Sequence, residues 1–405
     1  MASYKKIPAN NKQGYKWICT LEGPPDPVTG KRKQVPRRGE TKKEAYDRAK
    51  AVVDALNSGL DLKKAKKTTF KDAAYEWLDT YSRSAVKKST IRQRSKTLLV
   101  LLKHLSQINI DRVTHHQYQK ILNTLFDEGY SQSYLRSIHI VANMIFKWAI
   151  LNNLTKINPC IGATIPKRRL TVEDIERDEI EEKYLEREEL HEFLSAVLQR
   201  GLYGDKEIFY LLAFSGLRPG ELCALKWADI NFKTRDVRVS KTLYSPENNM
   251  YTAEVTPPKT DGSVRTFDVD EQIITMLKDF KEKQDARQSL YKKHSDDFYD
   301  ENFIFARVNG RPIGQKFLRD RMNRILKRLT IKKNATPHIL RHTHISMLTE
   351  AGVDLPTIMA RVGHDDEKTT LRIYTHVTKK MKKNASEKVK VHFGSILDSM
   401  FVPKM

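Results

Sequence analysis

Apolar residues recur at helical spacing from residue 68 to about residue 165, and this pattern limits the possible folds more than any other feature of the chain. Side chains three and four positions apart share one face of a helix, so the repeat predicts helices that each bury one face. We expect an all-helical domain whose core contains Phe70, Ala73, Ala74, Trp77, Leu78, Tyr81, Leu98, Leu101, Leu102, Leu105, Ile138, Val141, Ala142, Ile145, Phe146 and Ala149.

The first 65 residues follow a different pattern. Tyr15–Leu21 alternates and is rich in residues that favour strands, and after a turn containing Pro and Gly the segment 32–38 can return as a partner strand. Thr41, with Glu44 three residues later, is a typical helix start, and Gly59 is a typical helix end. The segment therefore predicts a small sheet with one helix, and it carries a net charge of roughly +10.

Helices and strands are mixed from about residue 183 onward. The predicted elements are a helix at 208–214, strands at 237–239, 252–257 and 264–269, and a helix that begins at Thr336-Pro337. Asp261-Gly262 lies between the last two of these strands and is a typical hairpin turn, so we expect those two strands to pair.

These patterns predict a multidomain, mainly α protein. The expected parts are a β-sheet-plus-helix domain at 1–65, a helical domain at 68–165, a linker at 166–182, a mixed α+β domain at 183–384 and a C-terminal tail at 385–405. The tail is too apolar to remain in water, so it should dock either on its own domain or on a neighbouring copy, and the sequence leaves both open.

The chain carries a large excess of positive charge. Its 405 residues include 73 Lys and Arg against 50 Asp and Glu, which gives a formal net charge of +23. This charge favours a polyanionic partner, nucleic acid first and an anionic membrane second. No apolar run approaches the ~20 residues that span a bilayer, and no signal peptide follows Met1, so we expect a cytosolic protein. Its three separated cysteines fit reduced thiols.

Basic and hydroxyl side chains gather where they could contact a nucleic-acid backbone. One group lies in the N-terminal domain, a second at the starts of two predicted helices whose free amides could also bind phosphate, and a third at the start of the linker. The candidates are Lys33, Arg37, Arg38, Lys87, Lys88, Ser89, Thr90, Arg92, Arg94, Ser131, Arg136, Lys167, Arg168 and Arg169. The alternative is that each is a solvated surface residue.

Tyr374 follows a series of basic residues along the chain, which are Arg218, Lys259, His338, Arg341 and His364. A tyrosine can cleave a phosphodiester if its phenol is deprotonated, cations hold the non-bridging oxygens and an acid protonates the leaving 5′ oxygen. Arg218 and Arg341 are suited to hold these non-bridging oxygens, because a guanidinium binds phosphate oxygens bidentately and stays charged. We call this pair the clamp. Lys259 is a candidate for the general acid. The series predicts a metal-free DNA-cleaving site with Tyr374 as its nucleophile.

Two histidines and a glutamate complete the predicted site. His338 and His364 can exchange protons with the phenol or bond to the phosphate, and Glu221 lies in the first turn of a predicted helix, where an acid complements the helix dipole. His338, His342 and His344 together could suggest zinc. They lack thiols and the His-Glu-x-x-His order, so we expect neither a metal ion nor a cofactor.

The chain resembles the tyrosine recombinases, in particular the integrases of phages and conjugative transposons, over nearly its whole length. The positions that match the catalytic pattern of the family are Arg218, Glu221, Lys259, His338, Arg341, His364 and Tyr374. The match at Lys259 depends on how a hairpin is placed, and Lys241 is the alternative. The resemblance implies an arm-type DNA-binding domain at 1–65, a core-binding domain at 68–165 and a catalytic domain at 183–384.

The resemblance also implies the function. It is site-specific integration and excision of a mobile element, through a covalent 3′-phosphotyrosine and a Holliday junction, without metal or ATP. The implied partners are double-stranded DNA attachment sites, three further copies in a homo-tetramer on synapsed DNA that is a monomer when free, a host DNA-bending protein and an excision factor, with no membrane.

Two rival functions remain. One is a type IB topoisomerase, against which the separate basic N-terminal unit argues. The other is a DNA-binding regulator or replication initiator that never cuts, in which Arg218, Lys259, Arg341 and Tyr374 would have no reason to occur together.

Overall fold

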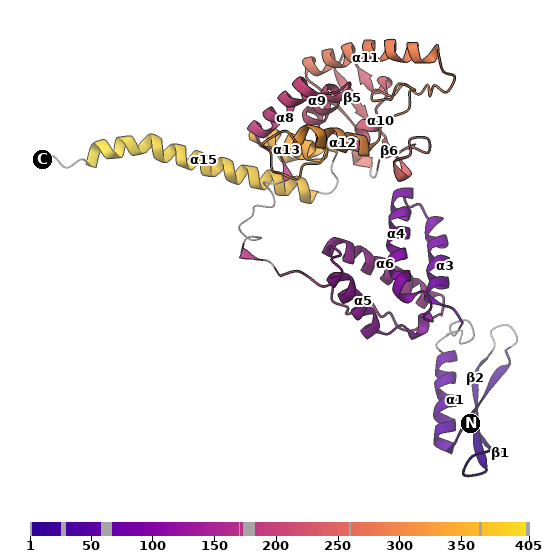
Figure 1. Cartoon of the computed structure of the whole chain (residues 1–405). Coiled ribbons are helices and arrows are strands. Elements are labelled where there is room, and N and C mark those ends of the chain that lie inside the picture. Colours follow the sequence, from indigo (N-terminus) through magenta and orange to yellow (C-terminus); the bar gives the residue numbers. More distant parts are fainter. Residues whose placement is uncertain are drawn as a thin grey trace. The chain divides into compact units, whose positions relative to one another are not determined.

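The computed structural model describes residues 2–25, 30–57, 67–169, 171–172, 183–258, 261–363 and 367–401 (Figure 1). Contacts divide the chain into two compact units, Met1–Leu170 and Thr171–Met405. The described residues are mainly helical with small antiparallel sheets, which confirms the predicted fold class. In this part of the chain, no helix is long and apolar enough to cross a membrane.

A three-stranded sheet and one helix begin the Met1–Leu170 unit (Figure 1). The elements are β1 (Ser3–Pro8), β2 (Tyr15–Pro25) and β3 (Arg32–Gly39), which pair antiparallel in that order, and α1 (Lys42–Asn57). Thr41 caps α1 as predicted, since its Oγ1 accepts a hydrogen bond from the Glu44 amide at 3.1 Å. A Cβ on Gly39 would lie 2.5 Å from the Ala45 nitrogen, so only glycine lets α1 approach β3 this closely. The helix end predicted at Gly59 lies outside the described residues.

Helices form the rest of this unit, as the apolar spacing predicts. They are α3 (Phe70–Ser82), α4 (Lys88–Leu105), the short 3-10 turn η1 (Ile110–Arg112), α5 (His115–Asp127) and α6 (Gln132–Leu151). Leu78, Tyr81 and Leu102 are partly buried at the edge of the core, and the other predicted core residues are buried within it. α5 adds Tyr118, Leu122 and its other apolar residues to the same core.

The Thr171–Met405 unit packs helices around a core that contains most of α9. Its helices are α8 (Arg187–Arg200), α9 (Asp205–Ser215), α10 (Pro219–Ala224), α11 (Glu271–Lys292), α12 (Gln315–Leu326), α13 (Ile339–Glu350), α14 (Leu355–Val362) and α15 (Glu367–Phe401), with short 3-10 turns η3 (Trp227–Asp229), η4 (Pro246–Asn248) and η5 (Asp261–Ser263). Ile208, Phe209, Leu211 and Leu212 of α9 are all buried, which confirms the helix predicted at 208–214.

The strands of this unit correct one prediction. They form two separate sheets, β4 (Ile230–Asn231), β5 (Asp236–Val239) and β8 (Arg265–Asp268) in one and β6 (Thr242–Tyr244) with β7 (Glu254–Thr256) in the other. The hairpin expected between 252–257 and 264–269 is therefore wrong, because β7 pairs with β6 while β8 pairs with β5. Alternating sequence predicts strands but not their partners, and Asp261-Gly262 forms the turn η5 between two sheets instead.

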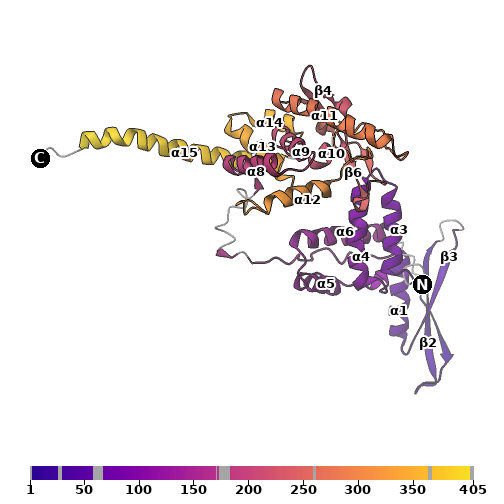
Figure 2. The same ribbon diagram turned by 45° about the horizontal axis from the view of Figure 1, so that its top comes forward.

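One helix begins later than the sequence predicts, and another crosses an expected domain border. α13 begins at Ile339, with His338 as the residue before it, because Thr336 closes a separate turn in which its carbonyl accepts from the Ile339 amide at 2.8 Å. α15 runs without a break from Glu367 to Phe401, so the border expected between 384 and 385 falls inside a helix. Both views show the far end of α15 reaching beyond the other helices of its unit (Figure 2). Val389 on this helix is exposed.

Candidate active site

The turn between α9 and α10 positions the first candidate residue. Gly216 ends α9 in the left-handed region, with φ of +65°, and a Cβ there would lie 2.7 Å from the His344 ring, so only glycine fits. Arg218 precedes Pro219 and is extended, with φ of −71° and ψ of 145°, as its position before a proline predicts. The local sequence thus places Arg218 at the start of α10.

Glu221 holds Arg218 from inside the protein. Its carboxylate is only 3% exposed, and it accepts from the Arg218 guanidinium at 2.6 Å, from the Arg218 amide at 3.0 Å and from Arg265 Nη2 at 2.9 Å. Burial alone would raise the pKa of Glu221, but the hydrogen bonds and charge of Arg265, with the charge of Arg218, keep this pKa below its usual value. Glu221 is therefore a buried carboxylate shared by two arginines.

Arg265 is the site residue that the sequence did not reveal. It lies on β8 with its side chain 5% exposed, and besides Glu221 it donates to the carbonyls of Arg361 at 2.8 Å and Ser263 at 3.1 Å. On β8, Arg265 and Phe267 are buried while the residues between and after them are exposed. A charged residue in the inward register of an alternating strand was the one signal that could have identified it.

Arg341 is completely buried in α13. Its Nη1 donates to the Gly216 carbonyl at 2.6 Å and its Nη2 to the Val362 carbonyl at 2.5 Å. Burial, and then the positive charge of Arg218, lower the pKa of this guanidinium well below its usual value. The positive charge of Arg218 thus acts on Arg341, the other arginine predicted for the clamp.

The end of α14 gathers all three arginines. The carbonyls of residues 361, 362 and 363 accept in turn from Arg265 Nε at 2.8 Å, Arg341 Nη2 at 2.5 Å and Arg218 Nη2 at 2.8 Å. The last carbonyls of a helix lack intrahelical partners and carry the negative end of its dipole, so they suit cations. We call Arg218, Arg265 and Arg341 the arginine cluster.

Three histidines on or next to α13 surround the cluster. His338 and His342 meet edge to face with ring centroids 4.9 Å apart, and His344 is buried with its Nδ1 3.0 Å from the Ala213 carbonyl and its Nε2 accepting from Arg361 at 3.3 Å. Part of His338 remains open to solvent. Loss of hydration, followed by neighbouring positive charges, lowers the pKa of each ring to about 4. All three are therefore neutral at pH 7.

Tyr374 lies on α15 and is partly buried. It packs against an apolar group made by Ile345 of α13, Val362 of α14 and Ile373 of α15, with their buried neighbours. The same Val362 provides the carbonyl that binds Arg341, so the apolar group on which Tyr374 packs adjoins the arginine cluster. Two residues after Tyr374, the His376 ring lies 3.3 Å from the Tyr184 hydroxyl.

Two predicted catalytic residues, Lys259 and His364, lie outside the described residues. The alternative to Lys259 was Lys241. Its ammonium group is paired with the Asp229 carboxylate at 2.5 Å, and both side chains are largely buried. An ammonium held this way is poorly placed to reach a substrate, which favours Lys259 as the candidate.

The predicted DNA-contact residues occupy the surfaces that the sequence suggested. Lys33, Arg37 and Arg38 lie on β3. Lys87 directly precedes α4, and Lys88, Ser89, Thr90, Arg92 and Arg94 lie on its first turns. Ser131 caps α6 by accepting from the Tyr134 amide at 3.3 Å. The described candidates include the exposed residues Lys33, Arg38, Lys88, Ser89, Ser131, Arg136, Lys167, Arg168 and Arg169. Their contact with DNA stays a prediction.

Comparison with known proteins decides the family. A family model described as the phage integrase family matches residues 183–381. The prophage ps2 probable integrase of Lactococcus lactis subsp. lactis is 32% identical over 370 residues, which cover 88% of this chain and 92% of the relative. This chain belongs to the phage integrase family. The integrase of Staphylococcus phage L54a is 29% identical over 80% of this chain and 93% of its own length.

The fold of this integrase agrees with solved structures. The Tn1549 transposon integrase in complex with a circular intermediate DNA matches 80% of this chain and all of that chain, with a TM-score of 0.61 and 21% identity. A lambda integrase dimer bound to a COC′ core site matches 91% of this chain and 94% of that chain, with a TM-score of 0.54 and 17% identity.

Family membership settles the general activity of the integrase. It is a tyrosine site-specific recombinase, the class of enzyme that integrates and excises mobile elements. This confirms the predicted recombinase over the topoisomerase and the non-cutting regulator.

Proposed function

We propose that Tyr374 is the nucleophile of this recombinase and that the arginine cluster binds the phosphate it attacks. The observation that carries this assignment is the position of Val362, which belongs to the apolar group on which Tyr374 packs and which binds Arg341 through its carbonyl. A phosphate held by Arg218 and Arg341 would then lie within reach of the phenol. Three arginines against the single carboxylate of Glu221 leave two net positive charges for the pentavalent transition state.

The proposed cleavage step conserves the energy of the phosphodiester. The Tyr374 oxygen forms a bond to phosphorus, the bond from phosphorus to the 5′ oxygen breaks, and a 3′-phosphotyrosine and a free 5′ hydroxyl result. Lys259 gives the proton that the 5′ oxygen takes up. His338, which its lowered pKa leaves neutral at pH 7, can accept the phenol proton directly, with His364 as the second candidate.

Strand exchange is the reverse reaction with a new partner. The 5′ hydroxyl of another strand attacks the phosphotyrosine, and two such rounds produce and then resolve a Holliday junction. A solved lambda integrase tetramer bound to a Holliday junction, which matches 88% of this chain with a TM-score of 0.55, supports a tetramer as the working assembly. The DNA-bound Tn1549 and lambda integrases likewise support double-stranded attachment-site DNA as the partner. A host DNA-bending protein and an excision factor complete the proposed system.

Two domains of the Met1–Leu170 unit divide the DNA-binding work in this proposal. The basic domain at 1–65 binds arm-type sites through Lys33, Arg37 and Arg38, and the helical domain at 68–165 binds core sites through the helix starts near Lys88 and Ser131. At these helix starts, free amides and basic side chains can bind the same phosphate. The segment 166–182 links this domain to the catalytic domain that begins at residue 183.

Substitution of single hydroxyl groups tests the nucleophile. Tyr374→Phe should bind a core-site duplex as the wild type does and form no covalent adduct, because only the attacking oxygen is lost. Tyr184→Phe is the matched control, since Tyr184 belongs to the same apolar group and its hydroxyl lies 3.3 Å from the His376 ring. Adduct formation by Tyr374→Phe, or its loss in both variants, would reject the assignment.

A further inference from the structure

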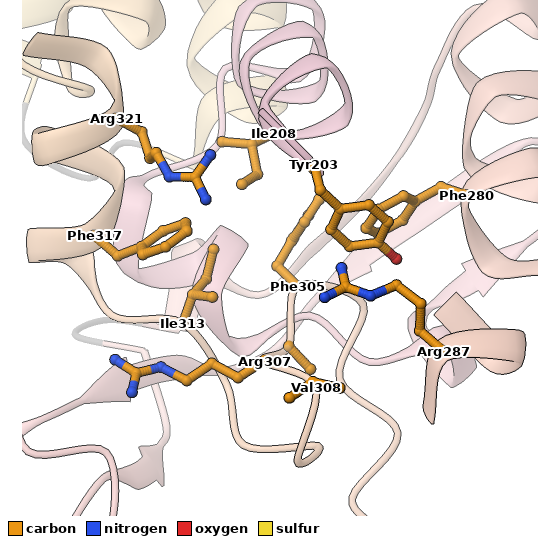
Figure 3. A pocket seen from close by; sticks show the side chains of 12 residues that line it. Tyr203, Ile208, Phe280, Arg287, Phe305, Arg307, Val308, Ile313, Phe317 and Arg321 are labelled. Carbon is orange, nitrogen blue, oxygen red and sulfur yellow. The ribbon is translucent and has the colours of Figure 1, made fainter. Parts of the chain in front are cut away.

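A separate pocket in the Thr171–Met405 unit lies away from the arginine cluster. It has a volume of about 190 Å³ and is lined by twelve residues from the start of α9, from α11, from the turn before α12 and from α12 itself (Figure 3). α9 has 11 residues, so its two ends lie ~16 Å apart. The pocket adjoins the N-terminal end of α9 through Gly204, whereas Arg218 follows the C-terminal end of this helix.

The floor of the pocket is apolar. Ile208, Phe280, Phe305 and Ile313 form it and are buried, and Figure 3 shows their side chains directed into the same hollow. Cavities of ~150 Å³ accept benzene, whereas sites for drug-sized ligands start at ~300 Å³. The pocket therefore has room for one bulky apolar side chain and is too small for a nucleotide cofactor.

Apolar side chains also surround the opening. Tyr203 and Val308 line the pocket and are 42% and 41% exposed, and Leu202 beside them is 50% exposed. An exposed apolar patch beside a pocket is typical of a surface that binds another protein.

The rim is positively charged. Arg287, Arg307 and Arg321 line the pocket, and none of its lining residues is acidic. Arg321 is paired with Asp205 at 2.9 Å, but among the described residues no carboxylate pairs with Arg287 or Arg307. The Arg287 guanidinium instead lies 4.0 Å from the centre of the Tyr203 ring. Two exposed guanidinium groups thus remain available to a partner.

A tight turn fixes one side of this rim. The Arg307 amide donates to the Arg311 carbonyl at 2.8 Å and the Gly310 amide donates to the Arg307 carbonyl at 2.9 Å. A Cβ on Gly310 would lie 2.2 Å from the Tyr299 carbonyl oxygen, so glycine is required. Because the turn is held in place, Arg307 and Val308 need little reordering to bind a partner.

We propose that this pocket is a docking site for an acidic segment of a partner protein that inserts one bulky apolar side chain. The apolar floor would take the side chain, and Arg287 and Arg307 would pair with carboxylates on either side of it. A DNA backbone would use the charged rim but leave the phenylalanine floor unused, so the pocket fits an acidic protein segment better than a nucleic acid.

A labelled synthetic peptide tests the proposal on the full-length protein. The probe has one phenylalanine flanked on both sides by aspartate and glutamate, and its binding is measured by fluorescence anisotropy at physiological salt. Arg287→Glu combined with Arg307→Glu should weaken binding about 10-fold or more, because two attractive charge pairs become repulsive. Ala306→Leu, which fills the pocket without a change of charge, should weaken it as well. A peptide with alanine in place of phenylalanine should bind worse to the wild type.

Arg319→Glu combined with Arg328→Glu is the matched control, because both arginines are exposed, neither lines the pocket, and the charge changes equally. This control should lose less than about 3-fold in affinity, since exposed charges act weakly at a distance. Equal losses in both double variants would mean general attraction to a basic protein and would overturn the proposal. Equal binding of the alanine peptide and the phenylalanine peptide to the wild-type protein would also overturn the proposal. A larger loss of random-duplex affinity in the pocket variant than in the control, without peptide binding, would reassign the surface to DNA.

Discussion

Replacement of Arg265 by methionine should destabilise the catalytic unit strongly. The substitution keeps most of the side-chain volume but removes the charge that pairs with Glu221, and it leaves the carbonyls of Arg361 and Ser263 without these donors. Both partners of the ion pair are 5% exposed or less, so little solvent screening applies. Loss of one partner of a buried pair costs roughly 3–5 kcal/mol, and since Glu221 keeps Arg218 we expect about 3 kcal/mol.

This loss should appear in the melting transition of the Thr171–Met405 unit. For a unit of this size, about 3 kcal/mol corresponds to a fall in Tm of ~6–12 °C, which scanning calorimetry of the full-length protein can resolve. Lys316→Met is the matched control, because it breaks an exposed pair with Asp320 whose side chains are 58% and 57% exposed. The control should change stability by less than about 1 kcal/mol. Equal shifts for both variants would refute the structural role of Arg265.

The pH dependence of the Arg265→Met variant tests the same reasoning through Glu221. In the wild type the pKa of Glu221 is below its usual value, so its carboxylate is charged at both pH 8 and pH 5. Without Arg265 the cost of burial should raise this pKa. The carboxyl group then takes up a proton as the pH falls and loses the charge that Arg265 no longer balances. The difference in Tm between variant and wild type should therefore narrow from pH 8 to pH 5, and a constant difference would contradict the argument.

Three further predictions address other parts of the integrase. The pKa values of about 4 for His338, His342 and His344 mean that the unfolded chain binds more protons than the folded chain between pH 6.5 and pH 4, so the urea midpoint should be highest near pH 7.5 and fall by pH 5; an unchanged midpoint would show that these rings are not neutral in the fold. Lys259→Ala should stall cleavage of a normal phosphate and recover when the 5′ leaving oxygen is replaced by sulfur, because a thiolate leaves without an acid; failure of this rescue would move the role of general acid to another residue. Removal of residues 1–65 should abolish binding to arm-type sites, measured by gel shift over a range of salt concentrations, and leave core-site binding intact; equal binding to both classes of site would reject the arm-binding role.

The candidate catalytic residues could be proposed from the sequence because they lie in short motifs. Arg218 is set by Gly216 before it and Pro219 after it, so local conformation alone indicates its place. Helix spacing likewise predicted the core of the helical domain, since it depends only on residues three and four apart. Features of this kind can be read from a few neighbouring residues.

The missed features depend on contacts between distant segments. Arg265 looks like an ordinary strand residue until β8 is placed beside α10 and α14, which supply Glu221 and the Arg361 carbonyl. The hairpin expected around Asp261-Gly262 was wrong for the same reason, because β8 takes β5 as its partner across a long stretch of chain. Local sequence favours a strand or a turn, but its partners are chosen by the packing of the whole unit.

Identification of the residue that becomes attached to DNA tests the central claim most directly. The wild-type integrase would be incubated with a nicked core-site duplex from which the 5′ fragment diffuses away after cleavage, so that the covalent adduct accumulates. The adduct would then be digested with protease and nuclease and analysed by mass spectrometry. The account predicts a nucleotide joined through its 3′ phosphate to Tyr374 in the peptide that contains it. A nucleotide on any other residue, or a 5′ linkage, would contradict it.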